Sequence, residues 1–273
     1  MLGAIIGDII GSPYEAQEKN IKTKDFPLFS SRSKVTDDSV LTCAVAEAFL
    51  AHLKAPKIVD LRHALIDNLK EFGNCFQNVP YGQSFRRWMS DYLDKKPYNS
   101  FSNGSAMRVS SVGWLFDSLE KVEEMAKTSA EVTHNHPEGI KGAQGVAAAI
   151  FLARTTKDKE SVRAYINEKY YNLDFTIDGI RDTYTGSLEC ARSVPQAIAA
   201  FLESSDFEDS IRTAVSLGGD SDTIAAMTGS IAEAFYGIPE EIRNAGTAKI
   251  PPMLMEVVEK FQNFMELKKR YGL

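Results

Sequence analysis

Aspartate side chains gather in two short segments of this 273-residue sequence. The first segment is Thr36-Asp37-Asp38-Ser39, and the second is Gly218-Gly219-Asp220-Ser221-Asp222-Thr223. Each segment stands directly before an apolar pattern with helical spacing. A single Asp, Ser or Thr in that place is often only the N-terminal cap of the helix. A cap needs one oxygen side chain, however, and each segment supplies two carboxylates and at least one hydroxyl.

The chemistry of these two segments follows from their charge. Four carboxylates that lie close together repel one another, and their pKa values rise unless a cation compensates them. Oxygen ligands are typical of Mg²⁺, Mn²⁺ and Ca²⁺, whereas Zn²⁺ favours His and Cys. An EF-hand calcium loop is excluded, because the Gly and the distal Glu of its spacing are missing around Asp222. The two segments therefore predict a site for a hard divalent cation.

A polar turn at Asn103-Gly104-Ser105-Ala106-Met107-Arg108 could hold a phosphate. A glycine-containing turn at the start of a helix can aim backbone amides at an anion, with Arg108 as a nearby cation. An ordinary Asn-Gly turn explains the same residues equally well. The segment Tyr81–Ser84, followed by Arg86 and Arg87, offers similar chemistry more weakly.

Other residues suited to catalysis carry less information. His134 and His136 have no third soft ligand nearby, so we expect substrate contact or local hydrogen bonding from them. Glu15 follows Gly11 and Pro13, which should end the first helix and place Glu15 in a loop. The pattern alone gives Glu15 no role. Hydrolases with a Ser or Cys nucleophile are disfavoured, because the sequence has no Gly-x-Ser-x-Gly motif and no Cys with a His partner suggested by spacing.

Helices must position all of these segments. Apolar residues recur at helical spacing from Leu41 to Phe49, from Ile224 to Phe235 and from Leu254 to Met265, and an Ala- and Gly-rich helix is expected over Gly142–Arg154. Only brief stretches such as 174–177 suggest a strand. Three sets of breakers mark helix ends: Pro195 in a first turn, Gly237 to Pro239 after a helix, and Pro251-Pro252 before the last one.

Composition bounds the class of protein. The chain is 44% hydrophobic and 25% charged, which is ordinary for a globular protein, and no linker interrupts it. We therefore expect one all-α domain over residues 1–273 that acts as a monomer. A net charge of −6 argues against sequence-independent binding of nucleic acid. No apolar run is long enough to span a membrane, the N-terminus is a poor signal peptide, and the three cysteines are isolated, so we expect a cytoplasmic protein.

The order of the motifs resembles the ADP-ribosylglycohydrolase family, which includes the dinitrogenase-reductase-activating glycohydrolases. The resemblance runs from Met1 to about Pro239. It rests on five segments, and the pair of aspartate motifs is the most specific part of it. These segments are Gly3–Glu15, Thr36–Ser39, Asn103–Arg108, His134–Ala143 and Ser216–Thr223.

The resemblance implies an orthogonal all-helical bundle with two Mg²⁺ or Mn²⁺ ions, and it assigns roles by position. The metal ligands would be Thr36, Asp37, Asp38, Asp220, Asp222 and Thr223. The catalytic carboxylates would be Glu15, Asp38 and Asp220, with Glu15 approaching from a mobile loop. The substrate would meet Tyr81, Gly82 and Ser84 at the ribose beside the scissile bond, Asn103, Gly104, Ser105, Ala106 and Met107 at the phosphates, and His136 at the adenosine end.

The implied reaction is hydrolysis of the bond between ADP-ribose and an acceptor, which is an ADP-ribosylated protein side chain or a small molecule. Cleavage at the anomeric carbon builds oxocarbenium character. Two alternatives stay open: a catalytically silent member of the same fold that binds ADP-ribose or has a structural role, and a metal-dependent phosphohydrolase. A silent member should have lost metal ligands, whereas every expected ligand is present in this sequence.

Overall fold

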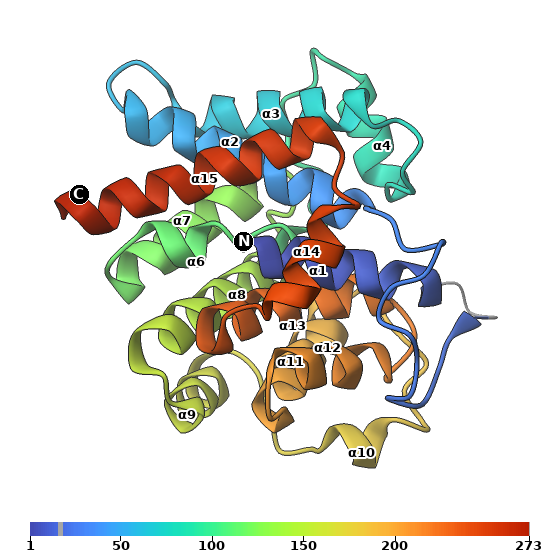
Figure 1. The fold of residues 1–273 in the computed structure, drawn as a ribbon. Coiled ribbons are helices and arrows are strands. Elements are labelled where there is room, and N and C mark those ends of the chain that lie inside the picture. The colour runs from blue at the N-terminus through green and yellow to red at the C-terminus, as the bar shows by residue number, and fades with distance from the viewer. Residues whose placement is uncertain (16–18, 273) are drawn as a thin grey trace.

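The computed structural model describes residues 1–15 and 19–272. Within them lie fifteen α-helices and one 3₁₀ helix (Figure 1). The first half contains α1 (Leu2–Gly11), η1 (Ser12–Tyr14), α2 (Asp37–Lys54), α3 (Leu61–Cys75), α4 (Gln83–Ser90), α5 (Gly104–Met107), α6 (Val112–Leu115) and α7 (Leu119–Glu131). The second half contains α8 (Pro137–Thr156), α9 (Lys159–Lys169), α10 (Ile177–Ile180), α11 (Cys190–Glu203), α12 (Phe207–Val215), α13 (Ser221–Tyr236), α14 (Glu240–Thr247) and α15 (Pro252–Tyr271).

The predicted all-α class is confirmed. The described residues contain no β-strand, and their one isolated bridge pairs Ser102 with Glu189. None of the described helices is long and apolar enough to cross a membrane. Helix α13 ends at Gly237 and α15 begins at Pro252, as the breakers predict. The three cysteines form no disulfide.

Two details of the predicted helices are wrong. Residues 174–177 form no strand, because Thr176 caps α10 by accepting a hydrogen bond from the amide of Gly179. Helix α11 begins at Cys190, so Pro195 lies inside it instead of in its first turn. A proline removes one backbone hydrogen bond of a helix and crowds the preceding turn. Burial of apolar surface offsets the cost of this lost hydrogen bond, since Pro195 and most of the helix after it lie in the core.

The pair α1 and α13 forms the centre of the molecule. All ten residues of α1 are buried, and glycines at Gly3, Gly7 and Gly11 face the backbone of α13. A Cβ on Gly7 would lie 2.1 Å from the carbonyl oxygen of Ala225, and one on Gly11 would lie 2.5 Å from the Cα of Asp222. Only glycine therefore allows α1 to approach the start of α13 so closely.

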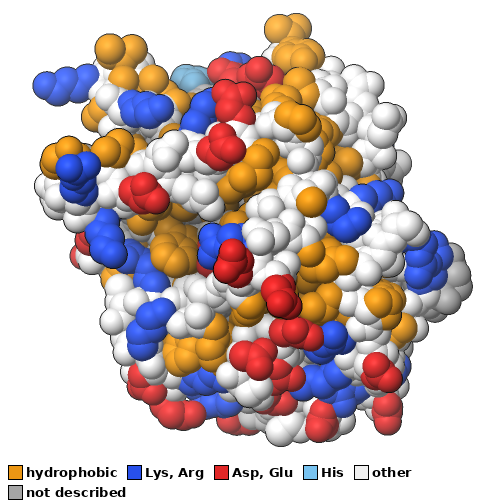
Figure 2. All heavy atoms as spheres, in the orientation of Figure 1, with side chains coloured by type: hydrophobic (Ala, Val, Ile, Leu, Met, Phe, Trp, Pro, Cys, Tyr) orange, Lys and Arg blue, Asp and Glu red, His pale blue; other side chains and the backbone are white. Residues whose placement is uncertain are grey.

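Other helices surround this pair. In Figure 1, α2 and α3 lie on one side of α1 with α15 across α2, and α8, α11 and α12 lie with α13 on the other side. The buried apolar side chains of these helices form one continuous cluster. On the face shown in Figure 2, acidic and basic side chains are interspersed among apolar ones. The helix starts of α2 and α13 meet next to α1, and this meeting point holds the aspartate segments.

Candidate metal centre and substrate cavity

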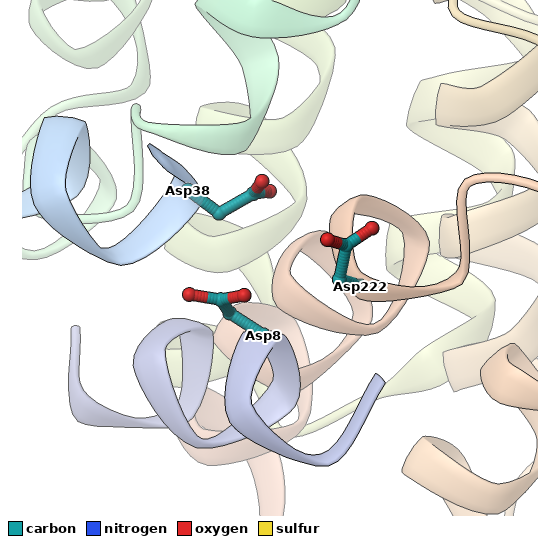
Figure 3. A group of neighbouring side chains, drawn as sticks. All are labelled: Asp8, Asp38 and Asp222. Carbon is teal, nitrogen blue, oxygen red and sulfur yellow. The ribbon is translucent and has the colours of Figure 1, made fainter. Parts of the chain in front are cut away.

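Three helices bring carboxylates to one point. Asp8 lies in the middle of α1, Asp38 in the first turn of α2 and Asp222 in the first turn of α13, and their side chains point toward one another (Figure 3). One carboxylate oxygen of each lies within 4.8 Å of the others. Glu15, Asp220 and Asp222 form a second group with the same spacing. The fold therefore unites two aspartate segments that are about 180 residues apart in the sequence.

Asp8 is the member of this centre that the sequence pattern did not single out. It is fully buried, and its oxygens accept hydrogen bonds from the amide and hydroxyl of Thr36, at 2.9 and 2.7 Å, and from the amide of Ser39 at 3.1 Å. The hydroxyl of Ser39 donates to it as well. The sequence does mark Asp8 in one way: it is the one charged residue of an otherwise apolar helix, and it lies between Gly7 and Gly11.

Burial and mutual repulsion raise the pKa values of the whole group of aspartates. Burial raises the pKa of Asp8 to about 6 and that of Asp220 to about 6. Burial, together with the charges of Asp8, Asp220 and Glu15, raises the pKa of Asp37 to about 8. The pKa values of Asp38 and Asp222 lie well above the usual range for the same reasons. A cation would relieve both the desolvation and the repulsion.

The donor atoms of this centre fit a hard cation. Asp38 Oδ1 is buried and has no hydrogen-bond partner among the described residues. Its other oxygen, Oδ2, accepts weakly from the hydroxyls of Thr36 at 3.3 Å and Thr223 at 3.2 Å. Every side chain at this point offers oxygen, which suits Mg²⁺ or Mn²⁺. The two groups of carboxylates, that of Asp8, Asp38 and Asp222 and that of Glu15, Asp220 and Asp222, could therefore hold a metal ion.

A cavity of about 380 Å³ opens over the carboxylates. Many of the residues assigned to the site from sequence line it, from both the acidic and the substrate segments. They are Glu15, Asp37, Asp38, Gly82, Ser84, Asn103, Gly104, Met107, Asp220, Asp222 and Thr223. Thr36, Tyr81, Ser105, Ala106 and His136 are not among the lining residues, although Thr36 lies directly beneath them through its contacts with Asp8 and Asp38.

The short helix α5 ties the proposed phosphate turn to the carboxylates. The side-chain amide of Asn103 donates a 2.6 Å hydrogen bond to Asp220 Oδ2. The hydroxyl of Ser105 is turned away, toward the carbonyl of Gly139. Arg108 is fully buried and borders the cavity, and its guanidinium donates to Ser129 and Thr133. Its Nε and Nη1 atoms have no partner in the described part of the chain.

The two histidines occupy different places. His134 is buried in the cavity wall, where Nε2 lies 3.1 Å from the hydroxyl of Ser102, and burial holds its pKa well below the usual range. His136 caps α8 by accepting from the amide of Glu138, and its ring lies edge-on to Phe101 with centroids 5.7 Å apart. Sequence spacing could not separate these positions, because the orientation of His134 depends on contacts with Tyr98 and Ser102, which are distant in the sequence.

A profile of the ADP-ribosylglycohydrolase family matches residues 1–270. The chain belongs to the ADP-ribosylglycohydrolase family. It is similar to ADP-ribosylhydrolase ARH3 of Homo sapiens, with 26% identity over 88% of this chain and 85% of the relative. It is also similar to ADP-ribosylarginine hydrolase Tri1 of Pseudomonas putida, with 25% identity over 98% of this chain and 75% of that protein.

The fold of this ADP-ribosylglycohydrolase family member has a solved counterpart. A structure named ADP-ribosylglycohydrolase-related protein complex matches it with a TM-score of 0.65 and 20% identity, over 91% of this chain and 94% of the other. This likeness confirms the expected helical architecture. The family resemblance read from the aspartate, Asn-Gly-Ser and His-x-His-Pro segments is confirmed as well.

One wall of the cavity comes from the start of α4 and the residues just before it. Pro80, Gly82, Gln83 and Phe85 line it, while Tyr81 points inward and is 5% exposed. The hydroxyl of Tyr81 has no partner in the described residues, and burial followed by the charge of Asp37 raises its pKa. An unpaired buried hydroxyl is costly. Tyr81 is therefore a donor that lacks its acceptor.

Proposed function

We propose that this protein is a metal-dependent hydrolase that cleaves the glycosidic bond between ADP-ribose and an acceptor and releases ADP-ribose. The observation that carries the proposal is the convergence of carboxylates from three helix segments at the floor of one cavity. A buried acidic cluster of this kind needs a cation to be stable with all its charges. Membership of the ADP-ribosylglycohydrolase family supports the choice of substrate.

The proposed cofactor is a pair of Mg²⁺ or Mn²⁺ ions held by Thr36, Asp37, Asp38, Asp220, Asp222 and Thr223. Two observations support this set. Asp222 belongs to both groups of close carboxylate oxygens, and Asp38 carries an unpaired buried oxygen. Such ions bind sugar hydroxyls and lower the pKa of a bound water.

The chain's own residues would hold the ribose and move the protons. Among Glu15, Asp38 and Asp220, one carboxylate would direct the attacking water and another would assist departure of the acceptor. Glu15 is exposed at the cavity mouth, next to the half-buried Asp220 and the buried Asp222, so it can reach both substrate and metal ligands. The Tyr81–Ser84 segment would lie near the ribose beside the scissile bond. Gly82 and Ser84 line the cavity there, and the side chain of Tyr81 is buried behind them.

The remaining contacts would orient the ADP portion. The turn at Asn103, Gly104, Ser105, Ala106 and Met107 forms the short helix α5 and would hold the phosphates. The amides of Asn103, Ala106 and Met107 already donate to backbone carbonyls, so the amides of Gly104 and Ser105 would be the ones to bind phosphate oxygens. His136 would lie at the adenosine end. Its neighbour Phe101 is 48% exposed and contacts the half-buried ring of His136, and such a pair of aromatic rings is suited to stacking on a base. We therefore add Phe101 to the proposed contacts, although the sequence pattern did not single it out.

Identification of the released nucleotide tests the proposal. Protein stripped of metal and then supplied with Mg²⁺ or Mn²⁺ should release intact ADP-ribose from ADP-ribosylated proteins or small molecules, as seen by chromatography. Arginine-linked and serine-linked substrates should be run side by side, because the relatives do not decide the acceptor for this chain. Release of AMP would favour the phosphohydrolase instead. Tight binding of ADP-ribose without turnover of any substrate would favour a silent member.

A further inference from the structure

We infer that Asp8 is a positioning residue for the metal centre: it accepts the hydrogen bond of the Thr36 hydroxyl and thereby leaves a lone pair of Thr36 Oγ1 and the unpaired Oδ1 of Asp38 for the cation. This inference rests on the proposed metal-dependent function. It concerns a residue that lies within 4.8 Å of the carboxylates of Asp38 and Asp222, so a direct role as ligand is the alternative.

The hydrogen bonds of Asp8 argue against direct ligation. A carboxylate has about four lone-pair sites on its two oxygens. Asp8 Oδ1 accepts from the hydroxyl of Thr36, and Oδ2 accepts from the amides of Thr36 and Ser39 and from the hydroxyl of Ser39. Three of these four donors occupy Asp8 Oδ2 and one engages Asp8 Oδ1, whereas Asp38 Oδ1 has no partner among the described residues and is the freer ligand atom.

The hydroxyl of Thr36 shows what this arrangement accomplishes. Its single proton has two acceptors within reach, Asp8 Oδ1 at 2.7 Å and Asp38 Oδ2 at 3.3 Å. The shorter contact is the stronger hydrogen bond. Donation to Asp8 leaves Thr36 Oγ1 as an acceptor: it accepts from the amide of Asp38 at 3.3 Å and keeps one further lone pair for the cation. A hydrogen bond from a metal-ligating group to a nearby carboxylate fixes the orientation of that group.

The position of Asp8 is set by helix packing. Gly7 and Gly11 flank it and hold α1 against the backbone of α13, while Asp8 itself points at the start of α2. The amides of Thr36 and Ser39 belong to that start, where the partial positive charge of a helix favours an anion. Helix α1 thus connects the two helices that carry the proposed ligands: it packs against α13, and its residue Asp8 is hydrogen-bonded to the start of α2.

Asp8→Asn provides a nearly isosteric test. In this variant, the side-chain oxygen would go on accepting from the backbone amides of Thr36 and Ser39. The side-chain nitrogen would then face Thr36 Oγ1 and donate a hydrogen bond to it. The Thr36 proton then turns toward Asp38 and the cation. We expect Mn²⁺ affinity of the metal-stripped full-length protein to fall about 10- to 100-fold with an unchanged number of ions bound. The free Mn²⁺ signal in electron paramagnetic resonance measures both quantities.

The matched control is Asp206→Asn, at the exposed N-terminal cap of α12, where Asn caps as well as Asp. Its Mn²⁺ affinity should equal that of the wild type. Unchanged affinity in Asp8→Asn overturns the inference, and so does the loss of one bound ion, which would make Asp8 a ligand. Failure of the wild type to bind Mn²⁺ would instead remove the metal centre from the proposed function.

A second variant serves if circular dichroism shows that Asp8→Asn does not fold. Ser39→Ala keeps the carboxylate of Asp8 and removes one of its four donors, which loosens its hold on the start of α2. We then expect Mn²⁺ affinity to fall at least about twofold, in line with the loss of a modest hydrogen bond. Equal or tighter binding would overturn the positioning role, because a ligand released from a competing donor should bind better.

Discussion

Asp38 is a buried carboxylate that a counter-ion would stabilise. Its side chain is 3% exposed, and burial together with the charges of Asp8 and Asp37 raises its pKa well above the usual range. Burying an unpaired charge away from water costs several kcal/mol. A bound cation would offset this cost, which is the basis for proposing Asp38 as a ligand.

Asp38→Asn should lower turnover at least about a hundredfold, because removal of one carboxylate weakens both metal affinity and activation of water. Far-ultraviolet circular dichroism should stay helical, since an amide keeps the shape of the side chain. Steady-state rates at several Mg²⁺ concentrations provide the measurement. Near-native rates at saturating metal would reduce Asp38 to a helix-start residue without a catalytic role.

Gly104 connects the phosphate turn with His134. A Cβ at Gly104 would lie 2.9 Å from His134 Nε2, so a larger side chain must displace the imidazole from the cavity wall. Gly104→Val should weaken ADP-ribose binding by at least about tenfold, or roughly 1.4 kcal/mol. Calorimetry with ADP-ribose, run beside a metal titration that should stay unchanged, checks this expectation. Unaltered ADP-ribose affinity would move the phosphate site elsewhere, with Arg86 and Arg87 as the next candidates.

At the scale of the elements, the contact between α1 and α13 decides where the carboxylates meet. The glycines of α1 allow its backbone to touch that of α13, which brings Asp8 beside the start of α2 and Asp222. Close-packed interiors tolerate added atoms poorly. The geometry of the carboxylate cluster therefore depends on glycines that contribute no side chain to it.

Gly7→Ala should destabilise the protein by about 1–3 kcal/mol, because the new methyl group would lie 2.1 Å from the carbonyl oxygen of Ala225. Gly82→Ala is the control: a Cβ there meets no atom within 4 Å, and φ is −56°. Urea unfolding followed by circular dichroism compares the two variants. Equal midpoints for both would show that α1 can shift away from α13 without cost.

At the scale of the whole molecule, the net charge of −6 is partly concentrated in one buried cluster. Folding raises the pKa of Asp37 to about 8 and those of Asp8 and Asp220 to about 6. The folded protein therefore holds more protons than the unfolded chain between about pH 4, the ordinary value for aspartate, and about pH 8. By linkage, the free energy of unfolding of the metal-free protein falls as the pH rises through this window.

Metal-free protein should accordingly melt at a lower temperature at pH 8 than at pH 5. Saturating Mg²⁺ should raise the melting temperature more at pH 8 than at pH 5, because protons compete with the ion at the lower pH. Differential scanning calorimetry in matched buffers measures both effects. A metal-free protein that gains stability between pH 5 and pH 8 would contradict the raised pKa values of the cluster.

The sequence by itself determined the helical class, several helix ends and the family. Those features depend on local rules. Apolar spacing indicates a helix, Gly237 marks the end of α13, and Pro252 marks the start of α15. Each of the two aspartate segments is recognisable within at most six residues. The same rules placed Glu15 after the first helix, where the structure has it. Pro195 was misplaced because the burial of α11, a tertiary property, outweighs its local preference.

Only the tertiary structure decided which polar residues share the cavity. Asp8 joins Asp38 and Asp222 because α1 packs against α13 across more than two hundred residues of sequence. His134 lines the cavity and His136 caps α8, although their spacing made them equivalent in the sequence. Arg108 is fully buried beside the cavity, where its guanidinium donates to Ser129 and Thr133. The physical reason is that such positions depend on the packing of distant helices, and no local pattern of hydrogen bonds or apolar spacing records that packing.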